Sequence, residues 1–138
     1  MTVESLIAAR RLERVPADGA GADRRLDAAQ RHLGSAEAIL DEDPDGAYAM
    51  LWDAARKAVT AHMLARGLRV RNAPGAHAAV AEYAIVELPV EASGELDRMR
   101  RFRNRIEYGS TSFTARQVRH DLRNTRAVVE AVRKALDR

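Results

Sequence analysis

The residues of this chain with the clearest chemistry lie between positions 98 and 109, in the sequence RMRRFRNRIEYG. Five arginines fall within eight residues there, at positions 98, 100, 101, 103 and 105. Leu96, Met99 and Ile106 recur at helical spacing. Position 103 completes their series, which places Arg103 on an otherwise apolar face. A cation on a buried face costs several kcal/mol unless it is paired or meets an anion, so this conflict marks a candidate functional position.

Two pairs of polar residues surround that position. Arg103 and Glu107 are four residues apart and can pair along a helix, as Asn104 and Tyr108 can on a neighbouring face. Arg103 and Tyr108 lie about 140° apart on an unbroken helix, at about 100° per residue. They meet on one ligand only over the helix end, or where a second subunit closes the site. The alternative is structural: Arg103 pairs with Glu107 or with a buried acid such as Asp53, and the other arginines are solvated.

The charge of the chain is distributed unevenly. Residues 1–95 carry 11 Lys/Arg against 15 Asp/Glu, a net charge of −4. Residues 96–138 carry 12 Lys/Arg against 5 Asp/Glu, a net charge of +7. This asymmetry favours a polyanion or an acidic partner near the last two predicted helices.

Metal and cofactor sites are not indicated. The chain has no cysteine, and its four histidines, His32, His62, His77 and His120, are not spaced as helical metal ligands. The acids at positions 41, 42, 43 and 45 are explained by helix capping and solvation. No phosphate-binding glycine loop of the usual patterns is present. We therefore expect no cofactor and no metal.

The composition predicts a cytoplasmic protein without a membrane span. No apolar run approaches the roughly 20 residues that cross a bilayer, and the first residues lack the pattern of a signal peptide. At 138 residues the chain is expected to form a single domain.

Hydrophobic periodicity predicts an all-α fold, an antiparallel bundle of four to five helices with short connections. Residues 1–21 are expected to form a short peripheral helix and a linker, and residues 22–137 the core. No strand-like alternation is evident. The predicted helices span 3–14, 22–41, 44–66, 74–88, 94–108 and the segment after 114, with a loop at 68–73.

Local capping signals support these boundaries. Asp43 followed by a proline predicts the start of the third helix, and Gly67 predicts its end. Ser93 is the expected N-cap of the fifth helix. Thr114 and Gln117 form the pattern of a capping box before the last helix.

Residues 103–108, RNRIEY, lie late in a small helical bundle and precede one more long helix. In this they resemble the HEPN superfamily (higher eukaryotes and prokaryotes nucleotide-binding), whose motif is R-x4-6-H, often with Asn after the Arg. Arg103 and Asn104 match, whereas Tyr108 stands at the histidine. One branch adds a final Tyr, and Ser110 does not match it. A second register, from Arg101 to Tyr108, places Ile at the histidine. The alanine-rich segment 47–58 also looks like actinobacterial HEPN proteins.

The resemblance implies a homodimer that binds RNA, and in its active form a metal-independent ribonuclease of toxin–antitoxin type. It implies Arg103, Asn104 and Tyr108 as catalytic residues, with the Arg on the scissile phosphate. A tyrosine, with a pKa of about 10, is a poor general base near neutral pH. Glu107 and Asp53 would support the site. The surrounding arginines, Arg98, Arg100, Arg101 and Arg105, would bind nucleic acid.

Two other functions remain open. The missing histidine favours a catalytically silent HEPN module that partners a nucleotidyltransferase or binds a nucleotide. In such a pair the nucleotidyltransferase-type partner would be the antitoxin. A purely structural dimeric bundle, whose arginines form salt bridges, is the third possibility. Tyr108 is the residue on which the choice between an enzyme and a binding protein depends.

Overall fold

The computed structural model describes residues 1–109 and 112–138, and at residues 106 and 107 it describes only the backbone. Across this part of the chain there are six helices and two short strands. In chain order they are α1 (Val3–Ala8), β1 (Leu12–Arg14), α2 (Gly19–Ile39), α3 (Pro44–Ala65), β2 (Leu68–Val70), α4 (Ala76–Glu87), α5 (Val90–Tyr108) and α6 (Ala115–Ala135).

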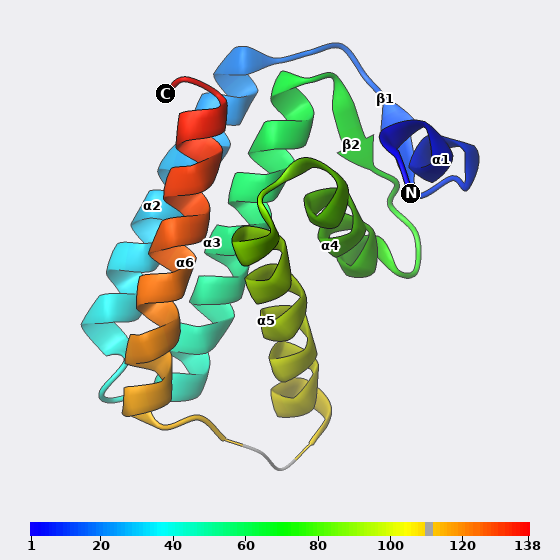
Figure 1. The fold of residues 1–138 in the computed structure, drawn as a ribbon. Coiled ribbons are helices and arrows are strands. Elements are labelled where there is room, and N and C mark those ends of the chain that lie inside the picture. The colour runs from blue at the N-terminus through cyan, green and yellow to red at the C-terminus, as the bar shows by residue number, and fades with distance from the viewer. Residues whose placement is uncertain (110–111) are drawn as a thin grey trace.

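The long helices form a bundle, as the sequence predicted (Figure 1). Helix α2 packs most extensively on α3, and α6 lies against both of them. Helix α5 packs on α3 and on the shorter α4. None of the helices in the described residues combines the length and apolarity needed to cross a bilayer.

The buried faces of the bundle follow the helical periodicity of the apolar residues in the sequence. On α2 and α3 these faces are rich in alanine, which lets the two backbones approach closely and explains their extensive contact. On α6 the valines and Leu122 face the core, and the buried Thr125 hydroxyl donates to the Asp121 backbone carbonyl at 2.7 Å. The buried residues include Leu26, Ala29, Leu33, Ala36, Ala47, Leu51, Ala54, Ala58, Ala61, Val118, Leu122, Val129 and Val132.

Most of the predicted capping interactions are present. Asp43 Oδ1 accepts from the backbone N–H of Gly46 at 3.0 Å, which caps α3. Thr114 and Gln117 form a capping box with bonds of 3.2 and 2.9 Å. Gly67 has a φ of +74°, and a Cβ there would lie 2.8 Å from the Val15 carbonyl oxygen. Only glycine fits this position, so α3 ends where the sequence indicated.

The N-terminal part of the chain differs from the prediction. The first helix ends at Ala8, and β1 pairs antiparallel with β2, where a helix end and a loop were expected. Leu6 and Leu12 are buried in the core, so this segment is not peripheral. Strands of three residues are too short for period-two alternation to appear in a sequence. Such strands are defined by the pairing between them.

Helix α5 also begins earlier than predicted. Its N-cap is Pro89 rather than Ser93, whose hydroxyl donates to the Val90 carbonyl at 3.2 Å from within the helix. The fixed φ of proline suits a helix start, and it outweighs the capping preference of serine. As a result α5 gains a turn before the arginine cluster.

Candidate nucleic-acid interface

Arg98, expected as a nucleic-acid contact, holds two helices together. Its Nη2 donates to Glu95 Oε2 on α5 and to Asp121 Oδ1 on α6, each at 2.6 Å. Only 6% of the Asp121 side chain is exposed. A buried carboxylate needs such a partner, so Arg98 is a tie between α5 and α6.

The neighbouring arginines also have partners, although 69% of the Arg101 side chain stays exposed. Arg100 and Arg101 both pair with Asp97, at 3.1 and 3.0 Å. The guanidinium of Arg105 lies over the Phe102 ring, 5.0 Å from its centroid, in a cation–π contact. The arginine cluster is therefore largely ordered along the surface of α5.

Arg103 is half-buried on α5. Burial, followed by the positive charges of Arg103 and Arg56, lowers the pKa of His77 on α4. Asp53, expected as its buried partner, has 48% of its side chain exposed and pairs with Arg56 at 3.6 Å. The side chain of Glu107, the other expected partner, lies outside the described residues.

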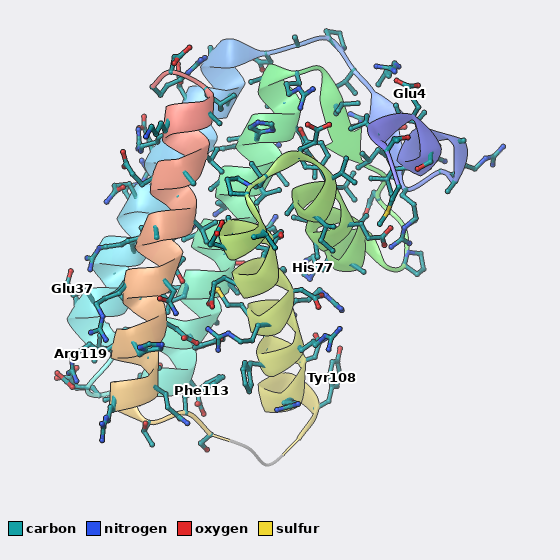
Figure 2. The ribbon with its side chains drawn as sticks, viewed as in Figure 1. Glu4, Glu37, His77, Tyr108, Phe113 and Arg119 are labelled. Carbon is teal, nitrogen blue, oxygen red and sulfur yellow. The ribbon has the colours of Figure 1, made fainter. Side chains whose placement is uncertain are left out.

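Tyr108 and Asn104 are exposed on α5, Tyr108 by 85%. Figure 2 shows Tyr108 on the side of α5 away from Phe113. The predicted catalytic residues Arg103, Asn104 and Tyr108 all lie in the last two turns of α5, Arg103 half-buried and the other two exposed. Ser110, which bears on the longer family motif, lies outside the described residues.

A groove between α5 and α6 lies beside the arginine cluster, and we call it the α5–α6 groove. Its volume is about 510 Å³. It combines two phenylalanine rings with four arginines, a histidine and a glutamine. The lining residues are Arg98, Phe102, Phe113, Arg116, Gln117, Arg119, His120, Asp121 and Arg123.

Aromatic rings form one part of this groove. Tyr48 of α3 stacks on Phe113, with ring centroids 3.9 Å apart and planes at 16°. Phe102 meets Phe113 edge-on at 5.8 Å. Burial, and after it the negative charge of Asp121, raises the pKa of the Tyr48 hydroxyl. The rings of Phe102 and Phe113 remain partly exposed, so they offer an apolar surface to a ligand.

The exposed face of α6 supplies the cationic wall. Arg116, Arg119, His120 and Arg123 occupy positions i, i+3, i+4 and i+7 and therefore share one face. Arg119 pairs with Asp41. Arg116 and Arg123 form no ion pair among the described residues, although Arg123 Nη2 lies 3.4 Å from His120 Nδ1. The sequence already contains this spacing, but the sequence-based prediction used only the net charge of the region.

Arginines of α6, and Arg138 just after it, pair with acids of α2 and with Asp41 just after that helix. These two helices run antiparallel, so the pairs follow one another along their length. The pairs are Asp23–Arg138 at 2.7 Å, Asp27–Arg133 at 3.9 Å, Glu37–Arg126 at 2.5 Å and Asp41–Arg119 at 2.9 Å. This ladder neutralises much of the positive charge in the C-terminal part, and Arg116 and Arg123 stand outside it.

The acidic junction between α2 and α3 has structural roles. Asp43 caps α3, and Asp45 Oδ1 accepts from the Phe113 backbone N–H at 2.7 Å. This second bond fixes Phe113 beside the groove. Within the described residues, no three His, Asp or Glu side chains are grouped to hold a metal ion.

No family model, curated protein or solved structure matches this chain. The HEPN resemblance therefore rests on residues 103–108 and on the order of the helices.

Proposed function

We propose that this protein binds single-stranded RNA in the α5–α6 groove. The proposal rests on one observation: two partly exposed phenylalanine rings line the same groove as Arg116 and Arg123. These arginines have no carboxylate partner among the described residues. Proteins that bind single strands combine stacking platforms with a positively charged path for the backbone.

The aromatic part of the groove suits an unpaired base. Phe102 and Phe113 meet edge-on at 5.8 Å, and both residues are partly exposed. The guanidinium groups of Arg98 and Arg105 lie over the Phe102 ring, 5.4 and 5.0 Å from its centroid, so a base that stacks on this ring takes the place of one of them. Stacking of one base on an aromatic ring contributes about 1–3 kcal/mol. A base paired within a duplex does not present its face in this way, so the groove favours single strands.

The polar part suits a phosphate and a ribose. Arginine forks match the geometry of phosphate oxygens, and Arg116 and Arg123 lie one on each side of His120 along α6. Gln117 and His120 supply hydrogen-bonding groups that a ribose 2′-hydroxyl can use. This last feature, together with the HEPN resemblance, favours RNA over DNA.

The proposal is tested by the affinity of the purified protein for a fluorescent single-stranded RNA. We expect Phe102→Leu to weaken binding about tenfold through lost stacking. The double substitution Arg116→Gln, Arg123→Gln should weaken it by about tenfold or more through lost phosphate contacts.

A matched control removes the same charge from the same helix. Arg126 and Arg133 pair with acids of α2, so the double substitution Arg126→Gln, Arg133→Gln should leave RNA affinity within about twofold of wild type. Equal losses in the two double variants would show that net charge, rather than the groove, determines binding.

A second candidate function is a metal-independent ribonuclease of HEPN type, formed by two chains. It is favoured by the exposure of Asn104 and Tyr108 near the end of α5, where a second chain can reach them. In such a homodimer the two Arg103 residues would act on one scissile phosphate, and a nucleotidyltransferase-type partner would be the antitoxin. RNA cleavage in the presence of a chelator, by a species that sediments as a dimer, is the test.

A further inference from the structure

A second basic cavity, of about 280 Å³, lies among α2, α3, β2 and the start of α4, and none of its lining residues lines the α5–α6 groove. Its apolar floor includes Met63 and Val80, which are buried in the core. Its rim carries four arginines and no carboxylate among the described lining residues.

The arginines of this cavity are held in place by the protein. Arg25 Nη1 donates to Thr60 Oγ1 at 3.0 Å, which joins α2 to α3 beside the cavity. Arg56 has only 28% of its side chain exposed. Its Nε is fully buried and finds no hydrogen-bond acceptor within the described part of the chain. Arg56 Nη2 lies 3.6 Å from Asp53 Oδ1, which holds this guanidinium at the rim of the cavity, where an anion can accept a further hydrogen bond from it.

His77, which lines this cavity, lies in a positively charged environment. His77 projects from the start of α4 (Figure 2) and meets the edge of the Trp52 ring, with centroids 5.4 Å apart. Burial, and then the charges of Arg103 and Arg56, lowers the pKa of His77. The imidazole is therefore neutral near pH 7 and can share a hydrogen bond with a ligand.

We infer that this cavity binds a small phosphate monoester, with Arg25, Arg56 and Arg71 around the phosphate and the apolar floor beneath a compact organic body. Arginine forks bind phosphate oxygens in pairs. The volume lies near the lower end of the range for small-molecule sites, which fits a single ring attached to the phosphate. This site is independent of the proposed RNA groove.

Phenyl phosphate is a suitable probe because it joins one phosphate to one apolar ring. Trp52 is the single tryptophan of the chain, and its contact with His77 makes its fluorescence a reporter of this cavity. Phenyl phosphate should change the Trp52 emission and, by calorimetry, bind about tenfold more tightly than inorganic phosphate or phenol, since both the charge and the ring contribute.

Three variants test the assignment. Arg56→Gln should weaken phenyl phosphate binding about tenfold, because a hydrogen bond to a charged group is lost. Arg71→Gln changes an exposed side chain and should weaken binding severalfold even if Arg56→Gln disturbs the fold. Arg24→Gln is the control, since Arg24 neighbours Arg25 on α2 but does not line the cavity.

The inference is overturned if phenyl phosphate does not bind wild-type protein, or if it binds without changing the Trp52 emission. It is also overturned if Arg71→Gln and Arg24→Gln bind the probe as wild type does. The variant Arg116→Gln, Arg123→Gln should keep phenyl phosphate binding. A failure of the RNA proposal is therefore distinguishable from a failure of this one.

Discussion

Arg103 stands where the helical pattern predicts an apolar side chain. Leu96 and Met99 are fully buried on the same stripe, whereas Arg103 is half-buried. It does not line the α5–α6 groove. Arg103 is therefore separate from the residues that we propose to bind RNA.

This separation gives a prediction for Arg103→Met, which keeps an apolar stem on the stripe. RNA affinity should stay within about twofold of wild type, because no groove contact is removed. Any RNA cleavage by the dimer should be lost. Fluorescence anisotropy and a gel assay of the same preparation measure the two properties, and a large loss of affinity would place Arg103 in the binding surface.

His62 gives a prediction for pH. Its Nδ1 lies 2.7 Å from the Tyr83 hydroxyl in the core, and burial, with the charge of Arg66, lowers the pKa of His62. The unfolded chain, with a histidine pKa of about 6.5, therefore binds more protons at mildly acidic pH. The free energy of unfolding should fall as the pH drops from about 7 toward 5, and less steeply in His62→Gln. Urea unfolding at several pH values measures both slopes, and identical slopes would contradict the assignment.

At the scale of the elements, the groove depends on the tie between α5 and α6. Arg98 bonds the buried Asp121 across the two helices, and its guanidinium also lies 5.4 Å from the Phe102 ring centroid. Asp45 fixes the backbone of Phe113 from α3. The groove is thus built by contacts from three helices.

Removal of this tie should be costly. Arg98→Gln leaves the Asp121 carboxylate buried without its cation, and we expect a loss of about 2–3 kcal/mol in the free energy of unfolding. Arg101→Gln is the control, because its pair with Asp97 is exposed and should contribute less than about 1 kcal/mol. Denaturant titration of both variants decides, and equal losses would show that the Asp121 pair has no special role.

The helices were predictable because their signals are local. Asp43, Gly67, Thr114 and the alanine stripes fix boundaries and faces without knowledge of the rest of the chain. The strands were not predictable, because β1 exists only through pairing with β2. For the same reason the sequence did not reveal that Phe102 and Phe113 meet, or that Arg98 reaches Asp121. The spacing of the basic residues on α6 was visible in the sequence. Only the structure shows which of these arginines pair with acids of the α2 region and which do not.

At the scale of the molecule, the uneven charge has a structural explanation. The acids of α2, and Asp41 just after it, pair with successive arginines of α6 and with Arg138. The net charge of this region is therefore larger than the charge that it offers to a partner. Such surface pairs contribute little stability each, but they determine which cations stay open to a ligand. Arg116 and Arg123 lie outside the ladder and beside the aromatic rings.

The most direct test of the RNA proposal is the salt dependence of RNA affinity. For single strands the slope of log K against log salt changes by about 0.7 for each phosphate contact. The double substitution Arg116→Gln, Arg123→Gln should therefore reduce the magnitude of the slope by about 1.4. Arg126→Gln, Arg133→Gln should leave the slope at the wild-type value. If the two double variants share the same slope, whether wild-type or reduced, the α5–α6 groove is not the RNA-binding surface.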